Sequence, residues 1–251
     1  MRWEGYRRKW PTVWPGVRSA LEEFGGGELG PLLERLRRDP ALRRALRPRL
    51  GITVSRFFRG QQSFETLARV LLPDLPSAGE VKAWSAGCAC GEEPYTLAIV
   101  WGERIRPARP RLILRVLATD VREDCLERAR RGLYPPSSVR NVPPELCERY
   151  FECGPSGYLF RPPAGVVVEF QRADLLEDPP PGGCRVALCR NLAFTYFGPE
   201  GQEVAWKALA QAVLPGGILV IGDRESLPPA ARDRGAFEPV PGDRTVYRHV
   251  P

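Results

Sequence analysis

The fold is decided by the stretch Trp84-Ser-Ala-Gly-Cys-Ala-Cys-Gly-Glu-Glu-Pro94, which joins a strand-like segment at 81–85 to a helix-like segment at 94–106. Two glycines in it, Gly87 and Gly91, allow the backbone to turn tightly and to approach a ligand closely. Proline is well placed in the first turn of a helix. The stretch therefore predicts a strand, a glycine-rich turn and a helix in succession.

Strand-like and helix-like segments continue to alternate after this turn. The expected strands are 112–118, 166–170, 185–189, 218–222 and 245–250, and the expected helices are 122–132 and 200–214. This alternation predicts an α/β fold with a doubly wound, mainly parallel sheet. Residues 134–163 interrupt the rhythm, and Gly154-Pro-Ser-Gly157 before Tyr158-Leu-Phe predicts a small hairpin or insertion there.

The region before the first strand has a helical pattern. Leucines recur at three- and four-residue spacing between residues 17 and 50, and another helix is expected at 63–72, before Pro73. We therefore predict a helical domain at 1–73 and an α/β domain at 74–251. Residues 1–72 hold 15 Lys/Arg and 7 Asp/Glu, a net charge of +8, whereas the remainder has 22 and 23. Such a basic module attracts acidic partners, although a solvated arginine-rich surface is an equal alternative.

Composition excludes several classes of protein and of chemistry. No apolar run is long enough to span a bilayer, and the basic N-terminal residues lack the apolar core of a secretion signal, so we expect a cytoplasmic protein without membrane insertion. The seven cysteines lack a second ligand pair, so we expect no metal site and reduced, buried thiols. The only histidine is His249, which disfavours Ser-His or Cys-His nucleophilic catalysis. The chemistry should need little proton transfer.

The charges beside the glycine turn indicate a cationic ligand. The spacing differs from the dinucleotide and P-loop motifs, and Glu92 and Glu93 would repel a pyrophosphate. S-adenosylmethionine carries a sulfonium and an ammonium group, which suit these acids. Asp120, after the second strand, can take both ribose hydroxyls, or it can cap the next helix. Asp174, after the third strand, can reach the adenine, or it can be an exposed loop acid.

Five segments together resemble the CheR-type chemotaxis receptor methyltransferases, in the order of that family. They are Ile52-Thr-Val-Ser-Arg-Phe-Phe-Arg59, Trp84-Ser-Ala-Gly-Cys-Ala-Cys-Gly-Glu-Glu-Pro-Tyr95, Leu117-Ala-Thr-Asp120, Cys189-Arg-Asn191 and Pro215-Gly-Gly-Ile-Leu-Val-Ile-Gly222. The resemblance implies a Rossmann-like, S-adenosylmethionine-dependent methyltransferase domain with a mainly parallel seven-stranded sheet. It also implies a small all-helical N-terminal domain, with the cofactor in the cleft between the two.

The resemblance assigns roles to single residues. The expected cofactor-binding residues are Thr53, Ser55, Arg59, Gly87, Glu92, Asp120, Asp174, Leu175, Arg190 and Asn191. The first three come from a loop that covers the cofactor, Asp174 and Leu175 flank the adenine, and the last two line the methyl end. Glu92 or Glu93 holds the methionine ammonium, with Glu92 slightly favoured.

Several positions depart from the family pattern. Leu192-Ala-Phe-Thr-Tyr196-Phe197 is one residue longer than usual, so either Tyr196 or Thr195 could supply the active-site hydroxyl. The closing motif is Gly222-Asp-Arg-Glu-Ser-Leu227, without the usual histidine. Ser55, Thr53 and Asp174 also differ from the family's usual residues. These changes suggest a divergent subgroup whose acceptor need not be a chemotaxis receptor.

The expected reaction is O-methylation of a glutamate side chain on an acidic protein, such as glutamate-bearing receptor helices, with S-adenosylhomocysteine as the product. Arg59 and Tyr196 are the expected catalytic residues, which orient the acceptor carboxylate opposite the methyl group. Two alternatives stay open: a methyltransferase with a small carboxylic acid, another protein or a nucleic acid as acceptor, and a non-catalytic cofactor-binding sensor. We expect no stable nucleic-acid complex, and the sequence does not indicate an oligomeric state.

Overall fold

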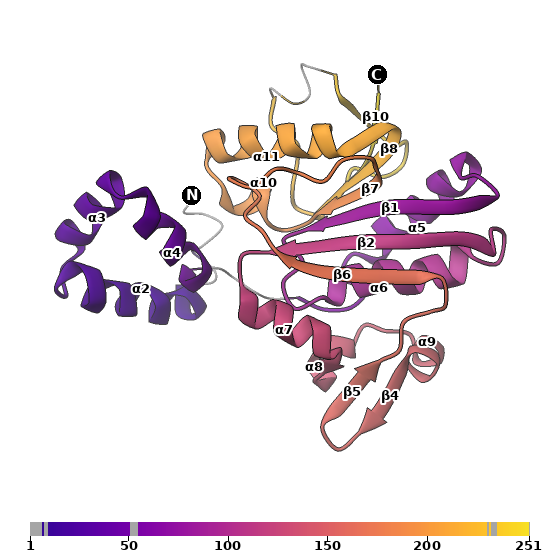
Figure 1. Cartoon of the computed structure of the whole chain (residues 1–251), viewed down its shortest axis with the longest axis horizontal. Coiled ribbons are helices and arrows are strands. Elements are labelled where there is room, and N and C mark those ends of the chain that lie inside the picture. Colours follow the sequence, from indigo (N-terminus) through magenta and orange to yellow (C-terminus); the bar gives the residue numbers. More distant parts are fainter. Residues whose placement is uncertain (1–6, 8–9, 51–54, 230, 232–234, 251) are drawn as a thin grey trace. The chain divides into compact units, whose positions relative to one another are not determined.

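The computed structural model describes residues 7, 10–50, 55–229, 231 and 235–250, apart from the side chains at 47 and 50. The chain divides into two compact units, Met1–Val54 and Ser55–Pro251, and Figure 1 shows the elements of each. None of the helices in these described stretches combines the length and the apolar character needed to cross a bilayer.

The first unit consists of helices. They are α2 (Trp10–Gly25), α3 (Leu29–Arg38) and α4 (Pro40–Leu50). Ala20, Leu32, Leu42 and Leu46 form its small core. The leucine spacing noted in the sequence therefore marks the buried faces only in part, since Leu29 and Leu33 are exposed. Gly26 and Gly27 have positive φ angles and allow the sharp turn after α2. The unit contributes three arginines at the end of α3, where cations interact favourably with the helix dipole.

The second unit is built on a seven-stranded sheet with the order β6-β2-β1-β7-β8-β10-β9. Its strands are β1 (Ala78–Ala86), β2 (Arg111–Asp120), β6 (Val166–Arg172), β7 (Cys184–Cys189), β8 (Val213–Ile221), β9 (Phe237–Pro239) and β10 (Val246–His249). The pairs among the first five are parallel, whereas β10 pairs antiparallel with both β8 and β9. The predicted mainly parallel seven-stranded sheet is therefore confirmed.

Helices cover the two faces of this sheet (Figure 1). They are α5 (Gln61–Leu71), α6 (Glu92–Val100) with the π-helical extension Trp101–Ile105, α7 (Glu123–Arg131), α10 (Ala193–Tyr196) and α11 (Pro199–Ala212). Leu67 of α5 and Ile99 of α6 share one core with Leu114 and Val220 of the strands. Trp206 of α11 belongs to a second core on the opposite face. The helix predicted at 63–72 thus packs within the second unit.

A small subdomain interrupts the α/β alternation between β2 and β6. It contains β3 (Leu133–Tyr134), α8 (Pro136–Val139), α9 (Pro144–Tyr150), β4 (Phe151–Gly154) and β5 (Gly157–Phe160). The strands form a separate antiparallel sheet in the order β3-β5-β4. The hairpin expected near Gly154 is present, but the sequence did not indicate β3 or the two short helices.

Candidate active site

The glycine turn lies at the edge of the sheet where β1 and β2 end. The backbone N–H groups of Gly87 and Cys88 both donate to the Thr119 carbonyl, at 2.7 and 2.9 Å. Gly91 has a φ of 89° and precedes α6 directly. A Cβ placed on Gly87 would lie 2.3 Å from a Leu192 methyl carbon. The turn therefore requires glycine for both its conformation and its packing against the loop after β7.

Asp120 ends β2 with its carboxylate directed at the same turn. One oxygen accepts the Ala89 N–H at 2.9 Å, and the other accepts the Arg122 N–H at 3.0 Å. Burial raises the pKa of Asp120, and these two backbone donors oppose the rise. The second contact closes a turn before α7, whose N-cap residue is Arg122 and has no side-chain cap, so Asp120 is not the cap of this helix. The first contact ties Asp120 to the glycine turn.

Asp174 and Leu175 lie beyond the end of β6, beside Asp120. Parallel pairing places Arg172 opposite Asp120, and the Ala173 N–H donates to the Asp120 carbonyl at 3.1 Å. Asp174 accepts the Leu176 N–H at 2.9 Å, which closes a tight turn. Asp174 and Leu175 line a pocket of about 320 Å³ whose other walls include Trp84, Leu117, Thr119 and Pro179–Pro181.

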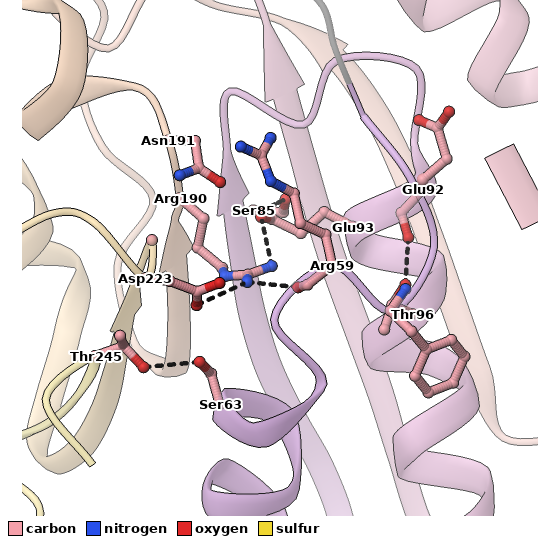
Figure 2. Close-up of polar contacts among 12 residues, drawn as sticks. Arg59, Ser63, Ser85, Glu92, Glu93, Thr96, Arg190, Asn191, Asp223 and Thr245 are labelled. Atoms are coloured by element: carbon pink, nitrogen blue, oxygen red, sulfur yellow. Dashed lines mark hydrogen bonds and ion pairs between the residues drawn. The ribbon is translucent and has the colours of Figure 1, made fainter. Parts of the chain in front are cut away.

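The two glutamates that begin α6 point in different directions, as Figure 2 shows. Glu92 is 3% exposed, and its carboxylate accepts the Ser138 hydroxyl at 3.0 Å. Glu93 accepts the Ser85 hydroxyl at 2.7 Å and lies 3.7 Å from the Arg190 guanidinium. Burial raises the pKa of Glu93, and the positive charges of Arg190 and Arg59 lower it. Glu93, and not Glu92, thus shares the sheet edge with the other expected site residues.

Arg190 follows β7 and is almost completely buried. Its side chain is 3% exposed and donates to the backbone carbonyl of Arg59 at 2.5 Å. The guanidinium lies 4.9 Å from the centre of the Phe64 ring and 3.9 Å from Asp223. The Arg190 side chain therefore fixes the Arg59 backbone to the sheet edge, and its Nε is buried without a hydrogen-bond partner among the described residues.

Arg59 and Tyr196, the two expected catalytic residues, lie close enough to interact electrostatically. Burial raises the pKa of the Tyr196 phenol, the positive charge of Arg59 opposes this, and the Glu225 carboxylate adds to it. Arg59 is exposed, and its guanidinium is drawn on the same side as the Asn191 amide in Figure 2. The Thr195 hydroxyl donates to Glu225 at 2.7 Å. The Thr195 hydroxyl is thus bound to Glu225, and the Tyr196 phenol interacts with the charge of Arg59.

Two further expected residues come from the segment before Arg59. Thr53 lies outside the described residues. Ser55 is described and half-buried. The next residues are fixed to the body by the Phe57 N–H, which donates to the Ser138 carbonyl at 3.1 Å, and by the Phe58 N–H, which donates to the Thr96 hydroxyl at 3.1 Å.

Sequence reasoning missed the polar residues that hold these groups in place: Ser85, Ser138, Asp223 and Glu225. Ser85, Asp223 and Glu225 belong to motifs that the sequence analysis quoted. Ser85 pairs with Glu93 within its own motif, whereas Glu225 and Ser138 pair with residues far away in the chain. The Glu225 contacts join residues about 30 positions apart, and that of Ser138 spans 46. Motif spacing carries no information on such pairings.

The donor set fits a cationic nucleoside. Asp120 binds the Ala89 N–H of the glycine turn, Glu93 binds Ser85 at the end of β1, and Asp174 lines the pocket beside Thr119. Among the residues that the structure covers, no group of three His, Cys, Asp or Glu is arranged to hold a metal ion. The seven cysteines are all free, and five of them are buried, whereas Cys147 is half-buried and Cys153 is exposed.

Comparison with known proteins agrees with this geometry. The family described as CheR methyltransferase, SAM binding domain, matches residues 53–245. A chemotaxis protein methyltransferase of Listeria monocytogenes is 30% identical over 200 residues, which cover 79% of this chain and 74% of the relative. Chemotaxis protein methyltransferase 1 of Pseudomonas aeruginosa is 30% identical over 220 residues, which cover 84% and 80%.

A third relative is much longer than this chain. An uncharacterized 104.1 kDa protein of Rhodobacter capsulatus is 35% identical over 204 residues, which cover 80% of this chain but 21% of that protein. The match to the family extends from Thr53 to Thr245, the residue before β10, and includes all the expected site residues. The chain therefore belongs to the CheR methyltransferase family and is an S-adenosylmethionine-dependent methyltransferase.

Proposed function

We propose that the enzyme O-methylates a carboxylate, the side chain of a glutamate on an acidic protein. The observation that carries this proposal is that Arg190 binds the Arg59 carbonyl, and Glu225 binds α10 with Tyr196, at the end of the sheet that bears the cofactor motifs. A guanidinium offers paired donors that match the two oxygens of a carboxylate. A phenol whose pKa is raised stays protonated at neutral pH and can donate a further hydrogen bond.

The acids of the site hold the cofactor in this proposal. Glu93 binds the methionine ammonium, because its carboxylate faces the site, whereas that of Glu92 is buried against Ser138. Asp120 binds the ribose hydroxyls, and Asp174 with Leu175 borders the adenine. The remaining expected contacts are the backbone at Gly87, Arg190 and Asn191, and the loop that carries Thr53, Ser55 and Arg59.

The reaction needs orientation more than proton transfer. The cofactor supplies an electrophilic methyl carbon on a positively charged sulfur. A carboxylate is already ionised at neutral pH, so no residue has to remove a proton from it. Arg59 and Tyr196 orient the acceptor oxygen and exclude water, and good alignment can contribute on the order of 7–11 kcal/mol. This requirement agrees with a site built from arginine, tyrosine and carboxylates.

The test is the base lability of the transferred methyl group. Lysate of the host cell is incubated with the purified protein and tritiated S-adenosylmethionine, and the labelled proteins are exposed to mild alkali. We expect label that mild alkali releases as methanol, because methyl esters hydrolyse and N-methyl groups do not. Tyr196→Phe should lower the labelling by at least about tenfold, the effect of one hydrogen bond to a charged group. Alkali-stable label would instead assign a nitrogen acceptor.

A further inference from the structure

The Glu225 carboxylate accepts three hydrogen bonds at the proposed active site. It lies in the turn that follows β8 and is 6% exposed. One of its oxygens accepts the backbone N–H of Asn191 and that of Gly222, both at 2.7 Å. The other accepts the Thr195 hydroxyl at 2.7 Å. Three donors converge on this one side chain from two separate loops.

The backbone leaves space for this arrangement at one glycine. A Cβ on Gly222 would lie 2.4 Å from the Asn191 amide nitrogen and 2.8 Å from the Glu225 carboxylate. The absence of a side chain at 222 therefore lets the loop after β8 approach the loop after β7. These strands are adjacent and parallel, so Glu225 joins their two carboxyl ends.

The same contacts decide how the lengthened segment after Asn191 is oriented. Thr195 and Tyr196 are consecutive residues in the single helical turn α10. Consecutive side chains on a helix point about 100° apart, because a turn contains 3.6 residues. With the Thr195 hydroxyl directed at Glu225, the Tyr196 ring must therefore point elsewhere. Asn191, the residue at the start of the segment, has a φ of 57°, an unusual conformation that its contact with Glu225 helps to hold.

We propose that Glu225 is a positioning residue, which sets the direction of the Tyr196 phenol through Thr195 and fixes the backbone of Asn191. In this arrangement Thr195 holds α10 in place through Glu225, and Tyr196 contacts the acceptor. The inference rests on the proposed function for the role of Tyr196 in the reaction. The contacts of Glu225 do not depend on which acceptor is methylated.

A carboxylate suits this task better than its neutral analogue. All three partners are donors, and a carboxylate is an acceptor on both oxygens. Glutamine would turn an N–H₂ group toward at least one donor, so at least one buried donor would lose its partner. The effect of Glu225→Gln should therefore exceed that of Thr195→Val, which removes a single hydrogen bond and keeps the shape of the side chain.

The experiment compares Glu225→Gln, Thr195→Val and Thr195→Ser with the full chain, and Glu238→Gln on exposed β9 is the matched control. Methyl transfer from tritiated S-adenosylmethionine to a synthetic glutamate-rich helical peptide gives kcat and KM. Calorimetry with S-adenosylhomocysteine gives cofactor affinity. Ultraviolet difference titration against Tyr196→Phe gives the pKa of the Tyr196 phenol.

We expect Thr195→Val to lower kcat by about tenfold, the effect of one hydrogen bond to a charged group, with an unchanged KM for S-adenosylmethionine. Thr195→Ser should restore the rate because it keeps the hydroxyl. Glu225→Gln should lower kcat further, weaken S-adenosylhomocysteine binding through Asn191, and lower the pKa of Tyr196. Glu238→Gln should match the wild type in all three measurements.

The proposal is overturned if Thr195→Val and Glu225→Gln keep the wild-type kcat, or if Thr195→Ser is as impaired as Thr195→Val. A wild-type protein that binds S-adenosylhomocysteine but methylates no carboxylate contradicts the proposed function instead. In that case the Tyr196 titration and the S-adenosylhomocysteine affinity still test whether Glu225 is a positioning residue. An unchanged pKa of Tyr196 and unchanged affinity in Glu225→Gln would then reject the positioning role.

Discussion

At the scale of single residues, the Asp120 carboxylate has two roles, in holding the backbone and in binding the ribose. It holds the Ala89 and Arg122 N–H groups, and in the proposed complex it also accepts the ribose hydroxyls. Asp120→Ala should therefore raise the dissociation constant of S-adenosylhomocysteine by about 100-fold, as expected for the loss of two hydrogen bonds to a charged group. Calorimetry measures this change. Asp124→Ala, an exposed acid in the same segment, should leave the affinity within about twofold, and a similar loss in both variants would contradict the specific role of Asp120.

The two glutamates of α6 allow a direct comparison between neighbours. Glu93→Gln removes the charge that faces the site and should weaken S-adenosylhomocysteine binding by about tenfold, because a hydrogen bond to a charged group is lost. Glu92→Gln changes a carboxylate that faces Ser138 and should alter the affinity by less than about threefold. Both affinities come from calorimetry at neutral pH. The opposite order would return the ammonium site to Glu92.

The pKa values of Glu93 and Asp120 predict a dependence on pH. Burial raises both above their ordinary values of 4.5 and 3.8. Their contribution to the stability of the ligand-free fold is therefore present below these values and is lost as pH rises through the raised pKa values. A cationic ligand favours the ionised carboxylates, so binding should release protons and affinity should increase with pH over that range.

Calorimetry at about pH 5 in two buffers of different ionisation enthalpy measures this proton release. The release should be smaller in Glu93→Gln, in which Asp120 alone still titrates. Identical apparent enthalpies in the two buffers, or an uptake of protons, would be inconsistent with ionisation of these carboxylates on binding.

At the scale of elements, the sequence predicted what local periodicity can encode. The expected strand at 112–118 is found as β2 and the expected helix at 200–214 as α11, each with slightly shifted ends. The three-residue strand β9 and the single turn α10 were not predicted, because segments of that length have no measurable period. The π-helical end of α6 was likewise not predicted, since its propensities are those of an ordinary helix.

The site was predictable to a similar extent. Gly87, Asp120 and Asp174 follow strands, and parallel strands bring their carboxyl ends together, so the sequence was sufficient to place them at one edge. The choice between Glu92 and Glu93 could not be made from sequence, because neighbouring residues at a helix start have the same composition signal. It depends on Ser85 and Ser138, which approach from β1 and α8.

The turn between β1 and α6 is an element whose conformation can be tested by one methyl group. Gly91→Ala places a Cβ at a φ of 89° and 2.7 Å from the Ala129 Cβ. We expect a loss of about 1–3 kcal/mol in the free energy of unfolding, from backbone strain and overpacking. Thermal unfolding by circular dichroism measures it. Gly182→Ala, which has open space and no positive φ, should unfold at nearly the wild-type temperature.

At the scale of the whole molecule, the net positive charge is concentrated in the first unit. Residues 1–54 hold 12 Lys/Arg and 6 Asp/Glu, a net charge of +6, while residues 55–251 hold 25 and 24. The cofactor residues that the structure describes all belong to the unit Ser55–Pro251. Binding of an acidic protein and binding of the cofactor should therefore respond differently to ionic strength.

Salt should weaken the binding of the acidic acceptor and leave the binding of the cofactor nearly unchanged. Exposed charges are largely screened beyond a Debye length of about 8 Å at physiological ionic strength. Raising the salt concentration should therefore raise the KM for a glutamate-rich peptide several-fold, while kcat and the affinity for S-adenosylhomocysteine stay nearly constant. Neutralising two exposed arginines of α3 in Arg37→Gln/Arg38→Gln should raise this KM and reduce its salt dependence. The control Lys82→Gln/Arg111→Gln removes the same charge from the body of the sheet and should leave both unchanged; equal effects of the two pairs would mean that only the total charge matters.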